Sequence, residues 1–96
     1  MSTPHTPDPL AEAEATESAL RAQLGELVSA KVRAEKEGGR LADRATVPGA
    51  APELAELSAR YRAQSGRLAA VVEEVRAGLR AQEGRTEQLR ASAAGA

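Results

Sequence analysis

The chain has 96 residues, a net charge of −1, a single tyrosine as its only aromatic residue and no cysteine. Without Phe or Trp it cannot fill a wide globular core, so only a narrow core of Ala, Leu and Val between helices fits this composition. The lack of Cys excludes disulfides and thiol chemistry, and the even mixture of acids and bases lacks the basic surface typical of nucleic-acid-binding proteins.

Residues 1–8 contain prolines and hydroxyl side chains and are expected to form a disordered tail. This segment has no basic region and no apolar core, so no cleavable signal peptide is expected. No apolar run approaches the ~20 residues of a membrane span. The expected location is the cytoplasm, in a bacterium with a GC-rich genome to judge from the high share of Ala, Arg and Gly; the alternative is secretion without a cleavable signal peptide.

A first helix is predicted over residues 9–45, with Asp8 as its cap and Pro9 at its first position. Apolar residues recur in it at alternating steps of three and four, which is typical of a coiled-coil seam. Gly38-Gly39 interrupts the pattern and either ends the helix or only weakens it. Leu41, which keeps the repeat in phase, favours a continuous helix. The repeat comprises Leu10, Ala13, Glu17, Leu20, Leu24, Leu27, Lys31, Ala34, Gly38 and Leu41.

Residues 46–51, which contain Pro48-Gly49, are predicted to form a turn of the length that joins adjacent antiparallel helices. A second helix is expected over residues 52–92, beginning with Pro52, and residues 93–96 are expected to form a disordered tail. The repeat resumes in this helix at Leu54, Leu57, Tyr61, Gln64, Leu68, Val71, Val75, Gly78, Gln82, Arg85 and Leu89.

The pattern therefore predicts an all-α fold, an antiparallel two-helix coiled-coil hairpin in residues 9–92. With a turn centred near Gly49, facing positions are those whose numbers sum to 98 or 99. In this register Gly38 makes room for Tyr61, and Gly78 makes room for Leu20. The large residues of the predicted seam are Leu10, Leu20, Leu24, Leu27, Leu41, Leu54, Leu57, Tyr61, Leu68, Val71, Val75 and Leu89.

Polar seam positions also match in this register. Glu17 faces Gln82, with Arg85 one turn away, and such a polar layer fixes register at some cost in stability. Lys31 faces the apolar seam, extends its stem to water, and lies four residues before Glu35, with which it is expected to pair.

The two edges of the predicted hairpin differ in character. Val28, Val72 and Leu79 flank the seam on one side, and two interpretations of them stay open: they widen the core of the hairpin, or they form an edge on which two hairpins meet as a four-helix bundle. Glu37 and Arg60 are expected to pair across the other edge. That polar edge comprises Gln23, Ala30, Glu37, Arg60, Arg67 and Glu74.

No catalytic, cofactor-binding or metal-ligating constellation is visible. His5 is the only histidine, and alone it forms neither a metal site nor a catalytic triad. The segment around Gly38-Gly39 lacks the spacing of a phosphate-binding loop. No enzyme activity, cofactor, metal or small-molecule substrate is expected.

Chain length, the single hairpin and its central turn resemble the Trp-x-Gly family of small type VII secretion proteins, whose members dimerise as four-helix bundles. The resemblance covers residues 9–92 as architecture. The family's turn motif would fall where this chain has Val47-Pro48-Gly49, and there is no tryptophan. The family's export signal pairs a tyrosine with an acid four residues later, but here Ser65 follows Tyr61 at that distance. No functional residue is carried over.

The function expected from the sequence is that of a structural or adaptor protein without enzyme activity. It acts through helix–helix contact, either with itself as a homodimer or with another helical protein, and binds no nucleic acid. The alternative is a small secreted hairpin of the type VII kind.

Overall fold

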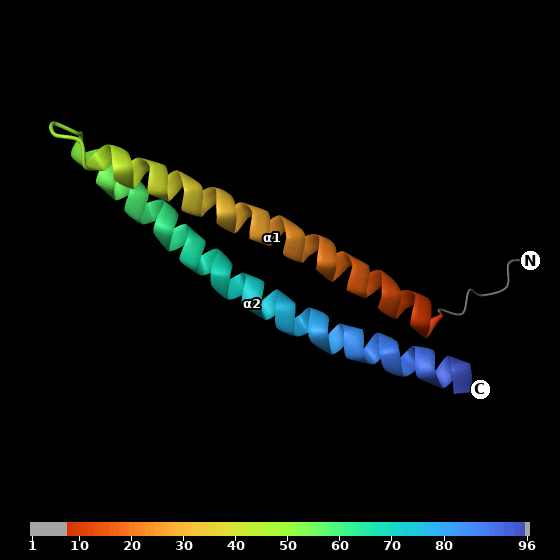
Figure 1. Ribbon diagram of the computed structural model, residues 1–96. Coiled ribbons are helices and arrows are strands. Elements are labelled where there is room, and N and C mark those ends of the chain that lie inside the picture. Colours follow the sequence, from red (N-terminus) through yellow and green to blue (C-terminus); the bar gives the residue numbers. More distant parts are fainter. Residues whose placement is uncertain (1–7, 96) are drawn as a thin grey trace, which may run out of the picture.

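The computed structural model describes residues 8–95, which form two α-helices: α1 spans Pro9–Ala45 and α2 spans Pro52–Gly95. The helices run side by side in opposite directions from a turn at one end, with Pro9 and Gly95 at the other (Figure 1). The molecule measures 73 × 32 × 13 Å along its principal axes. The all-α helical hairpin predicted from the repeat is confirmed.

Helix α1 begins as its sequence predicts. The Asp8 carboxylate accepts a hydrogen bond from the backbone N–H of Leu10 at 3.0 Å, and Pro9 occupies the first turn, where no amide donor is needed. The helix then continues without interruption through Gly38-Gly39 to Ala45. The interpretation in which the glycine pair ends the helix is therefore wrong.

A tight turn reverses the chain between the helices. The backbone N–H of Ala50 donates to the carbonyl of Val47 at 3.0 Å, and Gly49 has a φ of +81°, a conformation that glycine adopts at little cost. Helix α2 runs to Gly95, three residues beyond the predicted end, because the residues after Ser92 include no helix breaker before that glycine. The rest of the predicted tails, residues 1–7 and 96, lies outside the described residues.

The two helices bury facing rows of side chains that we call the seam. On α1 the buried and half-buried row follows the predicted repeat. On α2 every second predicted position is off by one residue. The α2 row comprises Leu54, Ser58, Tyr61, Ser65, Leu68, Val72, Val75, Leu79, Gln82, Thr86 and Leu89.

The placement of Leu57 and Val71 in the seam is thus wrong. Leu57 is 40% exposed and Val71 is 39% exposed, whereas their neighbours Ser58 and Val72 are 4% and 3% exposed. In the observed row, each α2 residue and the α1 residue level with it have numbers that add up to 99, as Gly38 and Tyr61 do. One constant register along both helices keeps the two rows in contact, and the predicted row does not satisfy it.

Of the two predictions about seam glycines, the one for Gly38 is confirmed and the one for Gly78 is wrong. A Cβ atom built on Gly38 would lie 3.3 Å from the Cβ of Tyr61 and 3.5 Å from the carbonyl oxygen of Ser58, so this glycine does face the ring-bearing residue. Around Gly78 no atom of α1 lies within 4 Å of such a Cβ, so the prediction that Gly78 makes room for Leu20 is wrong. Leu79, one residue later, is level with Leu20 in the observed register.

Candidate interaction faces

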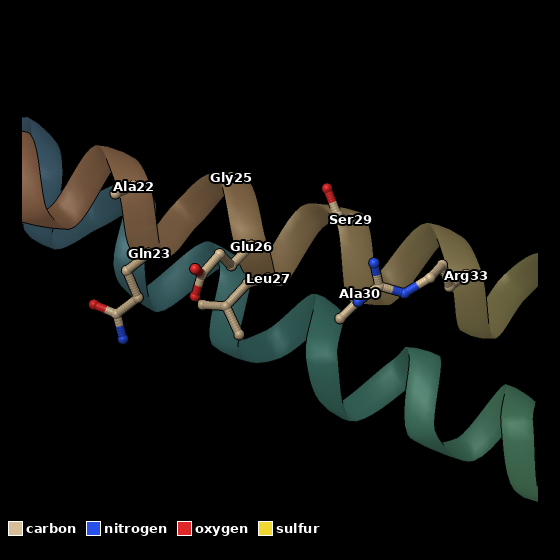
Figure 2. Close-up of a pocket in the computed structure, with 8 residues that line it drawn as sticks. All are labelled: Ala22, Gln23, Gly25, Glu26, Leu27, Ser29, Ala30 and Arg33. Atoms are coloured by element: carbon tan, nitrogen blue, oxygen red, sulfur yellow. The ribbon is translucent and has the colours of Figure 1, made fainter.

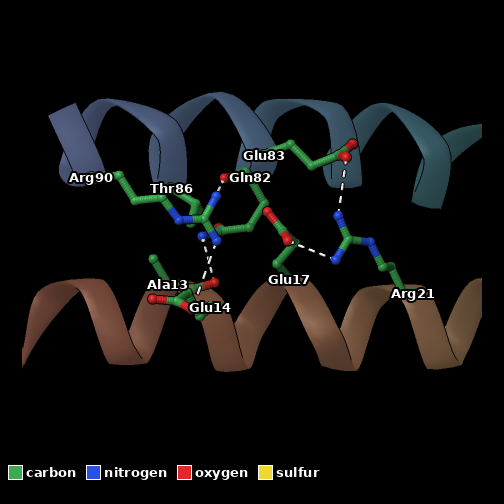
Figure 3. Close-up of polar contacts among 8 residues, drawn as sticks. All are labelled: Ala13, Glu14, Glu17, Arg21, Gln82, Glu83, Thr86 and Arg90. Atoms are coloured by element: carbon green, nitrogen blue, oxygen red, sulfur yellow. Dashed lines mark hydrogen bonds and ion pairs between the residues drawn. The ribbon is translucent and has the colours of Figure 1, made fainter.

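The seam divides the surface of the hairpin into two faces, and on one of them ion pairs join α1 to α2. Arg21 lies 3.3 Å from Glu83, and Arg90 lies 3.7 Å from Glu14; both pairs join α1 to α2 (Figure 3). All four residues directly follow seam positions, so they lie on the same side of it. We call this side the ion-paired face.

A buried carboxylate lies beside that face. Glu17 is 6% exposed, points between the helices in Figure 3, and pairs with Arg21 at 2.7 Å. Gln82, which is level with it, donates to the backbone carbonyl of Ala13 at 3.2 Å. The polar layer at Glu17 and Gln82 is present, but its guanidinium comes from Arg21 on the same helix, four residues on. Arg85, which was expected in this role, is exposed.

Three hydroxyl side chains lie in the α2 seam, and each has a partner. Ser58 donates to the backbone carbonyl of Gly38 at 2.8 Å, and Ser65 donates to the Glu35 carboxylate at 3.3 Å. Thr86 donates to a carbonyl of its own helix at 2.9 Å. Among residues 8–95 no buried side-chain polar atom lacks a hydrogen-bond partner. These bonds explain why serine and threonine are tolerated in the seam.

Two further ion pairs stay within α1. Lys31 lies 3.2 Å from Glu35, as its spacing predicts. Glu37 accepts hydrogen bonds from the guanidinium of Arg40, at 3.1 Å from Nε, and not from Arg60 across the helices, which corrects the predicted pair. The hydrogen bond from Arg40 lowers the pKa of the Glu37 carboxyl, and the same bond raises the pKa of Arg40.

The opposite side of the hairpin carries exposed apolar side chains. Residues that directly precede seam positions line it: Gln23, Ala30 and Glu37 on α1 and Leu57, Gln64 and Val71 on α2. Of the four large hydrophobic residues that are conspicuously exposed, Leu57 and Val71 lie on this side, two helical repeats apart on α2. We call it the Leu57–Val71 face.

This face is hollowed at two places. One shallow hollow is lined by α1 alone: Gln23, Glu26, Ala30 and Arg33 lie on this face, whereas Ala22, Gly25 and Ser29, which also line it, do not, and Ser29 points to the opposite side of the helix in Figure 2. A second hollow lies between the helices, where Ala34 and Glu37 of α1 meet Tyr61 and Gln64 of α2. Small side chains and glycine at these places leave room beside the larger neighbours.

Charges on the Leu57–Val71 face are mostly unpaired. Among residues 8–95, Glu26 and Arg33 on α1 and Arg60, Arg67 and Glu74 on α2 form no ion pair, although all five are exposed. Each lies three residues after a residue of the face and therefore beside it on the helix surface. Both cross-helix ion pairs lie on the other face.

Of the two interpretations of Val28, Val72 and Leu79, their burial agrees with the one in which they widen the core of the hairpin. Val72 is buried in the seam at 3% exposure, and Val28 and Leu79 are half-buried. The three residues thus contribute to the interior of the hairpin. The exposed apolar residues Leu57 and Val71 were missed as surface residues because they were assigned to the seam. The signal that could have found them is the register: only Ser58 and Val72 are level with α1 seam positions.

Among residues 8–95 no group of three or more His, Asp or Glu side chains is arranged to hold a metal ion. His5 lies outside the described residues. Neither α1 nor α2 combines the length and apolar character needed to cross a membrane.

No protein-family model matches the sequence, and comparisons with curated proteins and with solved structures find no significant match.

Proposed function

We propose that this chain is a non-enzymatic interaction module that binds a helical partner along the Leu57–Val71 face. The observation that carries the proposal is the uneven use of the two faces. One face closes with cross-helix ion pairs at Arg21 and Glu14, while the other exposes Leu57 and Val71. Leu57 and Val71 lie on one line along α2, between polar side chains, and an apolar centre with a polar rim is the usual composition of a contact site.

The geometry supports a helix as the partner. The face is long and narrow, and its two exposed apolar residues on α2, Leu57 and Val71, lie 14 residues or two heptads apart, a spacing that a facing helix can match. The hollow around Ala30 gives room for side chains of that helix to enter. Because the seam itself contains serine, threonine and glutamate layers, burying Leu57 and Val71 against a partner also adds apolar contact that the hairpin lacks.

Site-specific photo-crosslinking in cells that express the chain tests this proposal. A photoreactive residue replaces Val71 in one variant and Val32 in a second; Val32 is equally a valine on a helix surface, 38% exposed, but does not lie on the Leu57–Val71 face. We expect discrete crosslinked products from position 71 and none from position 32. The proposal fails if position 71 gives no product or the same products as position 32.

A further inference from the structure

Four unpaired charges of the Leu57–Val71 face, Glu26, Arg33, Arg67 and Glu74, form a self-complementary pattern; the exposed bases Arg60 and Arg85 lie outside it. Glu26 and Glu74 lie toward the end of the hairpin where the helices terminate, and Arg33 and Arg67 lie toward the turn. On each helix the acid and the base are seven residues apart, so they share one line along the helix. The midpoint between Glu26 and Arg33 on α1 and the midpoint between Arg67 and Glu74 on α2 lie at almost the same height along the hairpin. They differ by about one residue, or ~1.5 Å along the helix axis.

From this pattern we propose that the partner on this face is a second copy of the chain. This inference rests on the proposed function and specifies its partner. A two-fold axis that crosses α1 between Ser29 and Ala30 and α2 between Ala70 and Val71 places each helix antiparallel to its counterpart. Glu26 then meets Arg33 of the second copy, and Arg67 meets Glu74 of the second copy, on both sides of the axis.

The same two-fold rotation also brings apolar residues of the two copies into contact. Val71 packs against Val71 of the second copy at the axis, and Ala30 packs against Ala30, where the hollow along α1 leaves space. Arg85, the exposed base on the acidic half of the face, falls opposite Leu57 of the second copy, whose side chain its aliphatic stem covers. The product is a four-helix assembly in which each α2 contacts α2 and each α1 contacts α1.

Charge exchange between two positions tests the inference. Neither Arg67 nor Glu74 has an ion-pair partner among residues 8–95, so exchanging their charges leaves the fold of the single hairpin intact. In sedimentation experiments we expect Arg67→Glu alone and Glu74→Arg alone each to weaken dimerisation about ten- to thirty-fold, because each dimer then loses two ion pairs and gains two like-charge contacts. Arg80→Glu, an exposed position away from this face, is the matched control and leaves dimerisation unchanged.

The decisive sample is a mixture of the two single variants. In the heterodimer, the glutamate introduced at position 67 of one chain meets the arginine introduced at position 74 of the other, and the native pair forms on the opposite side of the axis. We therefore expect the mixture to dimerise as tightly as the wild type, and the double variant Arg67→Glu/Glu74→Arg to do so by itself. A wild type that stays monomeric at high micromolar concentration overturns the inference, as does a mixture no tighter than its components. Crosslinking from position 71 to a different protein would then still support the proposed function, and crosslinking to nothing would remove both.

Discussion

At the scale of single residues, the hairpin depends on small side chains where the helices meet. Ala13, Ala34 and Gly38 are buried on α1, and Ser58 and Ser65 are buried on α2. Small residues let two backbones approach closely, and the approach in turn lets Ser58 reach the carbonyl of Gly38 across the seam. At Gly38, therefore, the absence of a side chain is needed for packing and gives access to a hydrogen-bond acceptor.

The adjacent glycines of α1 give a matched pair for testing this role. Gly39 has open space around it, so Gly39→Ala is expected to stabilise the helix by up to about 1 kcal/mol through its higher helix propensity. Gly38→Leu forces a side chain into Tyr61 and the Ser58 carbonyl, and is expected to destabilise by about 1–3 kcal/mol. Urea unfolding followed by circular dichroism measures both values. Equal effects of the two substitutions would show that the helices do not meet at Gly38.

At the scale of the helices, α2 offers two alternative seams that differ by one residue at every second position. Both contain two large apolar residues at those positions: Leu57 and Val71 in one, Val72 and Leu79 in the other. Substitutions at the adjacent valines separate the two. Val72→Ala is expected to destabilise the hairpin by about 1–3 kcal/mol because it removes two methyl groups from a buried position.

Val71→Ala is the control, with an expected loss within about 0.5 kcal/mol because this side chain is on the surface. Both variants are unfolded in urea at a protein concentration low enough to keep the chain monomeric, so that any contact between copies does not contribute. If Val71→Ala proved the more costly substitution, the observed seam would be incorrect.

These two valines also show how far the sequence leads. Repeat, caps and turn are local signals, and they predict both helices, the reversal at Pro48-Gly49 and the whole α1 seam. The α2 seam is not local, because choosing it requires comparison with the facing helix. A preference for leucine over serine selects Leu57, whereas the observed Ser58 is buried with its hydroxyl satisfied by a carbonyl of α1. Apolar residues that are not in the seam lie on the surface. Assigning Leu57 and Val71 to the seam therefore also placed Val72 and Leu79 at an edge of the hairpin.

The polar contacts show the same difference between signals within one helix, which the sequence predicts, and contacts between helices, which require the register. Lys31 with Glu35 is a pair within one helix, and its spacing alone predicts it. The pairing of Arg21 with Glu83 depends on which side of each helix faces the other, and it follows only from the register. The identity of the base beside Glu17 was missed for a related reason: Arg21, four residues on in the same helix, pairs with Glu17, whereas the expected Arg85 is exposed.

At the scale of the molecule, the hairpin is an extended body. Its radius of gyration is 21.6 Å, compared with about 12 Å for a compact domain of the same length. A two-helix rod has a high ratio of surface to volume and little interior, so a second set of contacts along one face has a large relative effect on its stability. The elongated shape is thus suited to contacts that run along the length of the hairpin.

The end opposite the turn provides the most demanding test of this shape, because an error in register accumulates there. Ala13 and Thr86 are level with each other in the observed register and are 6% and 0% exposed. The natural chain has no cysteine, so the double variant Ala13→Cys/Thr86→Cys contains the only two thiols. We expect mild oxidation to give an intramolecular disulfide, visible by mass spectrometry and by faster migration on non-reducing gels, and to stabilise the hairpin by up to about 4 kcal/mol because the loop that it closes is long.

Ala13→Cys/Arg85→Cys is the control, since residue 85 is exposed beside the seam, and its thiols are expected to oxidise slowly or between chains. Faster intramolecular closure in the control would move the register by one residue and, with it, the level at which Glu26, Arg33, Arg67 and Glu74 can meet a second copy.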